Sequence, residues 1–401
     1  MTRLPPPCAS TTLHRDARDT AGAAPRPSTG DAVIDIYDGA VPGFVAAELE
    51  RLYENIYTTQ RRHTIYNEIA GASTYVKRSG GQIRAVFLFR RERHTLRVLN
   101  QQIAVSESEL GELCEALFAH YPAARTIAFF ALECQPRALA LPHRRYWCLE
   151  DIVLRLPPTL PQYMDALGQK MRYNLRSCER KILRDFPSFS FVNLDTAAAG
   201  EPVVRAIIAL AAARMASKGR PAYLNDADTQ RIVALVAAYG MVGVARIDGR
   251  ICGGQICYRV GNNYFMHIVA HDPRYDSYRL GALILLYTFT ECIARGAREC
   301  SLMGGGNAHK ARFLGTPRDF HRILVYRSRL RRCLDMRQTY AAARHHHRRL
   351  ALALLALRAA RGRPPWPRWP PWLVRAGFAL GAVARELAAR RRRGAKNTVS
   401  R

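Results

Sequence analysis

The residues best suited to chemistry lie between Tyr264 and Gly281, where histidines, arginines and a glycine follow one another. His267 and His271 have side-chain pKa values near neutrality in the free amino acid, about 6.5, so each could take part in proton transfer or be an ordinary hydrogen-bonded histidine near the end of a sheet. Arg274 and Arg279 carry permanent charge and form charge-assisted hydrogen bonds with phosphates. Gly281 falls at the start of an apolar run, where the first amides of a helix favour an anion. The segment predicts a strand–turn–helix site for a diphosphate.

Further polar residues flank this segment. His267 and His271 alternate with apolar positions, so the sequence predicts that both point to one face of a strand. Asn307 and Lys310 follow a Gly-rich turn and could contact phosphates or an acceptor, or be ordinary polar residues at a helix start. Arg172 and Arg176 lie four residues apart on a basic helix, where they form either a solvated face or a platform for an anionic acceptor.

The elements that would position these residues follow from hydrophobic periodicity and turn signals. Helices are predicted at 162–186, 202–218, 226–239 and 280–296. Strands are predicted at 242–247, 251–260, 263–270, 299–302 and 322–327, the first three joined by Asp248-Gly249 and Gly261-Asn262-Asn263. Residues 31–155 show a similar rhythm of short strands and helices. The pattern indicates an α+β or α/β fold with two domains, at 31–155 and 156–330.

Four motifs of the second half resemble those of GNAT acetyltransferases, and more narrowly those of the CelD-like acetyltransferase family. They are the basic helix QKMRYNLRSCERKI, the hairpin ARIDGRICGGQICYRVGNNYFMHIVAHDPRY, the helix start YRLGALILLY and the turn LMGGGNAHKARFLG. The family usually has an acidic residue before that turn, whereas Ser301-Leu302-Met303 stands here. The paired layout is also similar to Fem-type transferases, which carry two GNAT-like domains.

The resemblance implies a mixed, mostly antiparallel sheet flanked by helices in each of two GNAT-like domains, and an acyl-CoA, most simply acetyl-CoA, as co-substrate without a metal. Candidate catalytic residues are then His267, His271 and Asn307. The acyl-CoA would contact Ile268, Val269, Ala270, Arg274, Tyr278, Arg279, Leu280, Gly281, Ala282 and Lys310. Arg172 and Arg176 would bind the acceptor, a small-molecule or glycan-linked amine of polysaccharide or cell-envelope biosynthesis.

The ends of the chain differ from its body. Residues 1–30 read as a disordered leader without a signal peptide. Residues 331–401 read as a basic helical tail, and the last 75 residues carry +18 of the net charge of +29. Tryptophans and arginines beside short apolar helices favour an anionic membrane surface as the partner of this tail, or a helical hairpin packed on the body. DNA is not expected, and RNA is less favoured because the aromatic and basic residues do not interleave.

Three functions are consistent with these features. The first is an acyl-CoA-dependent N-acyltransferase in the cytoplasm, either free or peripheral on the inner face of the membrane. The second is a Fem-type transferase that uses aminoacyl-tRNA. The third is a non-catalytic GNAT fold that serves as a membrane scaffold, an alternative kept open by the absent acidic residue.

Overall fold

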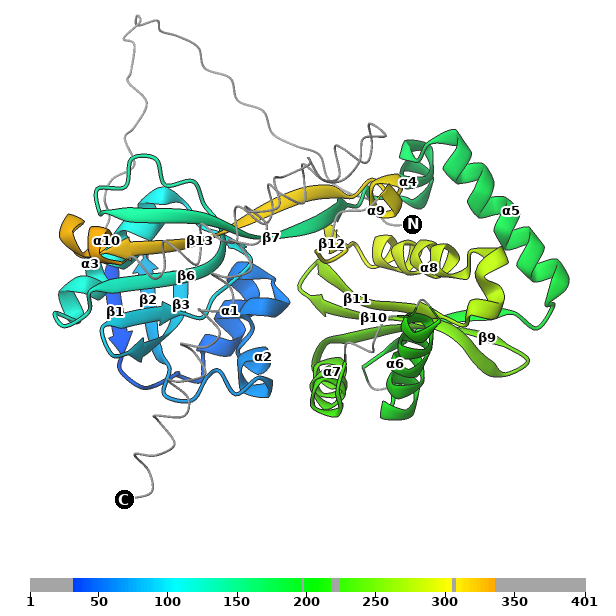
Figure 1. Cartoon of the computed structure of the whole chain (residues 1–401), viewed down its shortest axis with the longest axis horizontal. Helices are drawn as coiled ribbons and strands as arrows, with labels where there is room; N and C mark the ends of the chain where they lie inside the picture. Colours follow the sequence, from blue (N-terminus) through cyan, green and yellow to red (C-terminus); the bar gives the residue numbers. More distant parts are fainter. Residues whose placement is uncertain (1–31, 197, 218, 220–223, 305–307, 336–401) are drawn as a thin grey trace, which may run out of the picture.

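The computed structural model describes residues 32–196, 198–217, 219, 224–304 and 308–335 (Figure 1). The predicted leader, Asn307 and the tail beyond Asp335 lie outside these residues. None of the helices in the described part is both long and apolar enough to cross a membrane.

The first half alternates short helices with the strands of one sheet. Its strands are β1 (Val33–Tyr37), β2 (Ser73–Ser79), β3 (Gln82–Glu92), β4 (Thr95–Val98), β5 (Ile103–Ala104), β6 (Thr126–Glu133) and β7 (His143–Arg155). Its helices are α1 (Val45–Tyr53), the 3₁₀ turn η1 (Ile56–Thr58), α2 (Gln60–Ile65) and α3 (Glu107–His120). The hydroxyl of Ser106 caps α3 by accepting from the Glu109 amide, as the cap pattern in the sequence favours.

The second half repeats this order of elements. Its helices are α4 (Leu160–Ala166), α5 (Gln169–Asp185), α6 (Glu201–Ala216), α7 (Asp226–Tyr239), the 3₁₀ segment η2 (Pro273–Tyr278), α8 (Leu280–Ala294), α9 (Ala308–Arg312) and α10 (Arg329–Leu334). Its strands are β8 (Ser190–Asp195), β9 (Gly240–Ile247), β10 (Arg250–Val260), β11 (Asn263–His271), β12 (Glu299–Ser301) and β13 (Thr316–Tyr326). The predicted Asp248-Gly249 hairpin turn is present, with positive φ at both residues.

The described strands join in one sheet, and its two halves have a similar layout on either side of β13 and β7. It runs β1-β2-β3-β4-β6-β13-β7-β12-β11-β10-β9-β8, with β5 on β6. Most pairs are antiparallel, and the parallel ones are β4 with β6, β5 with β6, and β11 with β12. The long strands β7 and β13 form the centre and pass from one half to the other (Figure 1). Strand β13 falls within the predicted second domain, yet it pairs with β6 of the first half.

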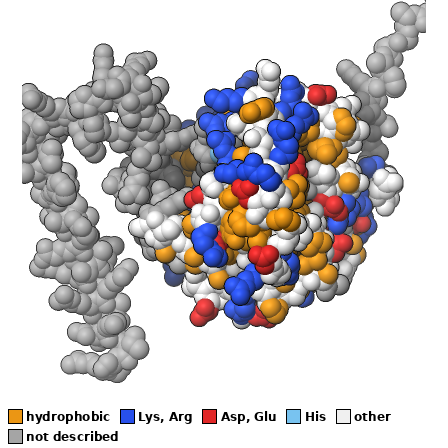
Figure 2. Space-filling view, turned by 90° about the vertical axis from the view of Figure 1, so that its right-hand side faces the viewer, with side chains coloured by type: hydrophobic (Ala, Val, Ile, Leu, Met, Phe, Trp, Pro, Cys, Tyr) orange, Lys and Arg blue, Asp and Glu red, His pale blue; other side chains and the backbone are white. Residues whose placement is uncertain are grey.

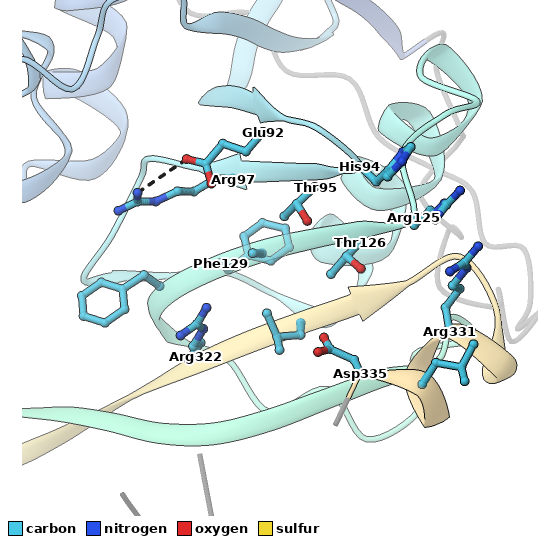
Figure 3. A pocket seen from close by; sticks show the side chains of 14 residues that line it. Glu92, His94, Thr95, Arg97, Arg125, Thr126, Phe129, Arg322, Arg331 and Asp335 are labelled. Atoms are coloured by element: carbon cyan, nitrogen blue, oxygen red, sulfur yellow. Dashed lines mark ion pairs between the residues drawn. The ribbon is translucent and has the colours of Figure 1, made fainter. Parts of the chain in front are cut away.

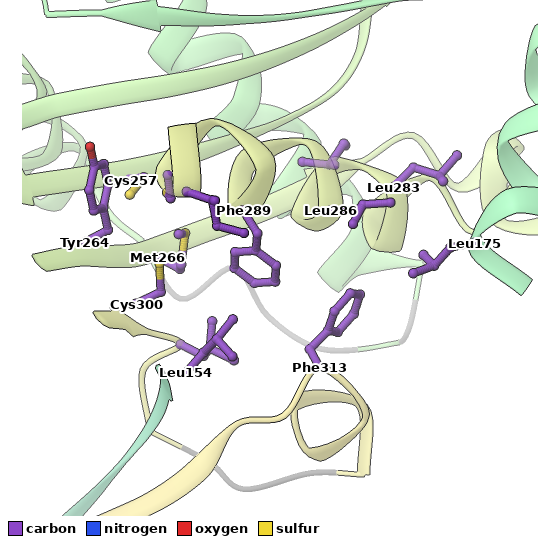
Figure 4. Packing of buried hydrophobic residues seen from close by; sticks show 14 of the residues in the cluster. Leu154, Leu175, Cys257, Tyr264, Met266, Leu283, Leu286, Phe289, Cys300 and Phe313 are labelled. Atoms are coloured by element: carbon purple, nitrogen blue, oxygen red, sulfur yellow. The ribbon is translucent and has the colours of Figure 1, made fainter. Parts of the chain in front are cut away.

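Helices cover both faces of the sheet in the second half. One core lies between the sheet and helices α4, α5 and α8, and includes Leu175, Phe289 and Phe313 (Figure 4). Another lies under α6 and α7 on the opposite face. Helix α8 is apolar nearly all round, as expected for a helix enclosed on most sides.

The predicted mixed, mostly antiparallel fold with flanking helices is confirmed, with two corrections to its elements. The last strand, predicted at 322–327, spans Thr316–Tyr326. The long helix predicted at 162–186 is two helices, because the chain becomes extended at Leu167 and Gly168 between α4 and α5. The amphipathic pattern continues across this elbow, so periodicity alone did not reveal it.

Candidate acyl-donor site

The site is built where β11 and β12 separate. These strands pair in parallel only from Asn263 to Phe265 on β11 and from Glu299 to Ser301 on β12. Beyond Phe265, β11 continues to His271, whereas the segment that follows β12 turns away from it. A pocket of about 790 Å³ occupies this region, a volume typical of small-molecule sites.

A β-bulge at His267 changes which way β11 side chains point. Ile256 of β10 pairs with Ile268 and the next residue, Cys257, pairs with Met266, so His267 is the extra residue. Consequently Met266 packs in the α8 core, whereas Ile268 packs under α6.

The two histidines therefore do not share a face, and that prediction is wrong. Nδ1 of His267 lies 2.8 Å from the hydroxyl of Tyr258, a residue of the core under α6. The ring of His271 instead packs against Gly281 at the start of α8, with Nε2 2.7 Å from Oδ1 of Asp276. Alternation along a regular strand gave the wrong answer because His267 is the extra residue of the bulge and does not follow the alternation of the residues after it. Both histidines still line the pocket.

Burial sets the protonation state of His267. It lowers the pKa of this imidazole to about 4, so the ring is neutral at physiological pH. The pKa of His309, another lining residue, is also lowered by burial and by the nearby charges of Arg312, Arg214 and Arg279. A neutral imidazole can accept a proton.

The start of α8 forms one wall of the pocket. Arg279 adopts the left-handed conformation (φ 50°, ψ 40°) just before the helix, and no side chain caps the helix there. Arg279, Gly281 and Ala282 line the pocket, as do Met266 through Val269 of the adjoining strand. Positive partial charge at an uncapped helix start favours an anion at this wall.

Cationic side chains predominate around the pocket. Arg214 of α6, Arg279, Lys310 and Arg312 line it, and Asp276 is the lining carboxylate. Nζ of Lys310 donates to the carbonyl oxygens of Met303 and Gly304, at 2.8 Å each, and so fixes the turn between β12 and α9. The pocket is suited to a ligand with several negative charges.

The other predicted donor residues lie outside the pocket lining. Arg274 forms an ion pair with Asp272 in its own turn, at 2.6 Å, and is largely exposed. The hydroxyl of Tyr278 donates to Asp185 of α5 at 3.0 Å. The side chains of Leu280 and Ala270 are buried in the two cores.

The two arginines predicted to bind the acceptor also lie apart from the pocket. Arg172 donates to the carbonyl oxygens of Met164 and Asp165, which fixes the elbow between α4 and α5. Arg176 is exposed on the outer side of α5, whereas Met171 of the same helix lines the pocket.

A carboxyl group that sequence reasoning missed lies behind the Gly-rich turn. Asp151 of β7 is 6% exposed, and its Oδ1 accepts a hydrogen bond of 2.8 Å from the hydroxyl of Ser301. Burial raises the pKa of Asp151 above its ordinary value. An acidic residue of the neighbouring strand β7 thus lies beside Ser301, where the sequence has no acidic residue directly before the turn. Its only sequence signal is an acidic residue, Asp151, at the start of the apolar run Ile152–Leu154.

A second pocket, in the first half, contains none of the predicted site residues (Figure 3). It lies over β4, β6, β13 and α10, and its lining includes Arg125, Arg322 and Arg331 together with the paired Arg97 and Glu92. It is distinct from the site between β11 and β12.

Comparisons with known proteins are consistent with this geometry. Residues 169–311 match the acetyltransferase (GNAT) domain family. The crystal structure of FemX shares 9% sequence identity, with a TM-score of 0.53, covering 69% of this chain and 95% of that one. The L-PGS structure from Bacillus licheniformis, at 13% identity and a TM-score of 0.45, covers 73% and 93%. A tandem GNAT protein of the clavulanic acid pathway, at 14% and 0.37, covers 74% and 98%. No curated protein matches the chain.

The family match, which ends at residue 311, covers the residues that line the pocket except Arg312 and Phe313. The likeness to FemX, at 9% identity, shows a shared fold. Residues 169–311 are therefore similar to GNAT acetyltransferase domains, and the fold is GNAT-like.

Proposed function

We propose that the protein is an acyl-CoA-dependent N-acyltransferase that binds acetyl-CoA in the pocket between β11 and α8. One observation carries this proposal: a single pocket joins the unpaired end of β11 to the uncapped start of α8 and is lined by Arg214, Arg279, Lys310 and Arg312. A strand edge can pair with the amides of a pantetheine arm, while the helix start and arginines favour the diphosphate.

The reaction follows from such an arrangement. The nitrogen of an acceptor amine attacks the thioester carbonyl carbon, the C–S bond breaks, and the thiolate leaves and takes up a proton. The ammonium proton passes to a neutral base, for which His267 and His309 are the pocket-lining candidates. Lys310, by fixing the Met303 and Gly304 carbonyls, holds the turn that closes this end of the pocket.

Isothermal titration of the full chain with acetyl-CoA tests the donor assignment. Arg279→Glu should weaken binding about 30-fold or more, since a charge-assisted hydrogen bond becomes a repulsion. Arg274→Glu is the matched control, because Arg274 lies in the same turn, pairs with Asp272 and is not a lining residue. Equal losses in both variants, or no binding by the native chain, would contradict the proposal.

The Gly281→Asp substitution is a poorer test. A Cβ at Gly281 would lie 3.0 Å from Nδ1 of His271, so a larger side chain would disturb packing as well as charge. Arg279 is exposed, so its replacement changes charge at the helix start with little effect on the core.

The class of the acceptor is a further part of this proposal. We infer an amine of polysaccharide or cell-envelope biosynthesis from the resemblance to CelD-like acetyltransferases. The alternative of a Fem-type transferase is supported by a fold shared with FemX over most of both chains. Titration with aminoacyl-tRNA beside acetyl-CoA separates the two, and binding of neither would favour the scaffold.

A further inference from the structure

The outer side of α5 carries a continuous stripe of exposed side chains. Tyr173, Arg176, Arg180 and Leu183 are spaced by three and four residues, so they lie along one face of the helix. On the inner side, Leu175 and Ile182 are buried in the core beneath α8. The stripe spans about 15 Å at the rise of an α-helix.

Two large hydrophobic side chains mark the ends of this stripe. Tyr173 is 66% exposed near the start of α5, and Leu183 is 47% exposed near its end. They rank among the most exposed large hydrophobic residues in the described part of the chain. Single exposed apolar residues are ordinary, but two at opposite ends of one arginine-lined helix face form a pattern.

The charge on this face is positive because of Arg176 and Arg180. Other basic residues of α5 are Lys170, Lys181, which lies over the ring of Tyr278, and Arg184. Figure 2 shows Lys and Arg side chains gathered on the upper part of the face of the molecule where α5 lies.

The carboxylates of α5 are engaged in other contacts. Glu179 accepts a hydrogen bond of 2.8 Å from the hydroxyl of Tyr287 on α8. Asp185 pairs with Arg184 and accepts from Tyr278. Neither acid neutralises Arg176 or Arg180 through a direct ion pair between described residues.

We propose that this face of α5 binds an anionic phospholipid surface. Arg176 and Arg180 lie over the lipid phosphates, and Tyr173 and Leu183 enter the boundary between headgroups and acyl chains. A nucleic acid would gain little from an exposed leucine, since single strands are held by stacking on aromatic rings and the stripe offers one. The aliphatic and aromatic ends, together with central arginines, fit a lipid boundary better.

The proposal is independent of the acyl-donor assignment, although it places the pocket beside the membrane. Met171, on the inner side of α5, lines that pocket. One helix diameter, about 10 Å, would then separate the lipid surface from the pocket wall. An acceptor amine displayed at a membrane would be within reach.

Co-sedimentation of the full chain with phosphatidylcholine vesicles, with and without one quarter phosphatidylglycerol, tests this surface. Arg176→Glu/Arg180→Glu should weaken binding to the anionic vesicles at least 25-fold, about fivefold for each basic residue removed from the surface. The control Arg61→Glu/Arg84→Glu changes net charge equally, at exposed first-half arginines, and should bind as the native chain does. Equal binding by the native and α5 charge-reversal proteins overturns the proposal, because another segment would then supply the contact.

A second variant separates lipid contact from general electrostatics. Tyr173→Ala/Leu183→Ala keeps the charge and should still weaken vesicle binding several-fold, while leaving the melting temperature nearly unchanged because both side chains are exposed. Unchanged vesicle binding in this variant contradicts the insertion of these residues. If the charge reversal weakens binding of a single-stranded RNA but not of vesicles, the face is a nucleic-acid surface and the proposal fails.

Discussion

The two halves of the sheet contain the same arrangement and use it differently. In each, two neighbouring parallel strands are connected through a helix: β4 and β6 through α3, and β11 and β12 through α8. In the first half, β5 adds to β6 where the second half has an open pocket. The first half thus completes its sheet at the position where the second leaves a binding site.

The N-termini of helices α3 and α8 also differ, and only that of α8 is suited to an anion. Ser106 caps α3, and Glu107 and Glu109 place negative charge in its first turn. Helix α8 has no side-chain cap and begins after Arg279. Acidic side chains at a helix start stabilise it but repel anions, whereas an arginine there recruits them. The comparison shows that a shared strand order does not by itself produce a pocket beside an uncapped helix start.

The largest effect expected from a difference between the two halves is the loss of stability on acidification caused by His267, the bulge residue of the second half. Burial lowers its pKa to about 4, so between pH 6.5 and 4 the unfolded chain binds a proton that the folded chain does not. Stability should therefore fall as pH drops through this window, by about 3 kcal/mol.

Urea unfolding at pH 7.5 and pH 4.5 measures this dependence. His267→Gln should remove most of it, because the amide does not titrate. Burial also lowers the pKa of His63 in the first half and of His309, so both contribute to the dependence that persists in the variant. If the native protein and the variant lose equal stability on acidification, His267 is not the buried titrating group inferred here.

A somewhat smaller effect is expected where α6 approaches the sheet. A Cβ at Gly254 of β10 would lie 2.6 Å from Cδ1 of Ile207 and 2.7 Å from the carbonyl oxygen of Gly243. Gly254→Ala should cost about 2 kcal/mol by overpacking, measured by chemical denaturation.

Gly43→Ala is the matched control in the first half. No atom lies within 4 Å of its added Cβ, so its stability should change by about 0.5 kcal/mol at most. Equal effects at the two glycines would show that the close approach of α6 is not needed for the second half.

A gain in stability, smaller than the loss at Gly254, is expected from Asp151→Asn. Because burial raises the pKa of Asp151, its folded form binds protons more readily than the unfolded chain, and stability falls as pH rises from its ordinary value of 3.8 through the raised value. The Asp151→Asn protein should unfold at a higher temperature than the native protein at neutral pH and should lack this pH dependence. Thermal unfolding followed by circular dichroism measures both. A lower melting temperature would indicate that the charged carboxylate is required for the bond to Ser301.

The smallest effect tests the first-half helix start. Ser106→Ala should cost about 1 kcal/mol of stability, the usual loss for a helix cap, without changing acetyl-CoA affinity. Arg279→Glu should show the reverse, a loss of affinity with little loss of stability. Titration with acetyl-CoA and thermal unfolding of both variants measure affinity and stability. A changed acetyl-CoA affinity in Ser106→Ala would contradict the separate roles of the two helix N-termini.

Local patterns were sufficient for most elements and for one wall of the pocket. Hairpin signals at Asp248-Gly249 and the apolar run after Gly281 predicted β9, β10 and α8 within a few residues. The predicted strand–turn–helix became a pocket wall at Arg279 and Gly281. These features depend on neighbours in the chain, which a sequence displays.

Features that depend on distant partners were not predictable. Arg274 and Arg279 lie in the same turn, yet only Arg279 lines the pocket, whose other walls come from distant parts of the chain. Asp151 meets Ser301 across 150 residues, only because β7 pairs with β12. Arg214 reaches the pocket from α6 on the opposite face of the sheet. A single sequence does not display such pairings.

The place of β13 has a consequence for the synthesis of the protein. This strand lies between β6 and β7, so the sheet of the first half is closed by residues 316–326, which leave the ribosome after nearly all of the second half. Until then β6 and β7 expose unpaired backbone edges, a surface prone to aggregation. If the chain folded strictly from its N-terminus, the facing edges of β6 and β7 would stay unpaired until β13 was synthesised, so the sheet of the first half is completed only when the second half is also present.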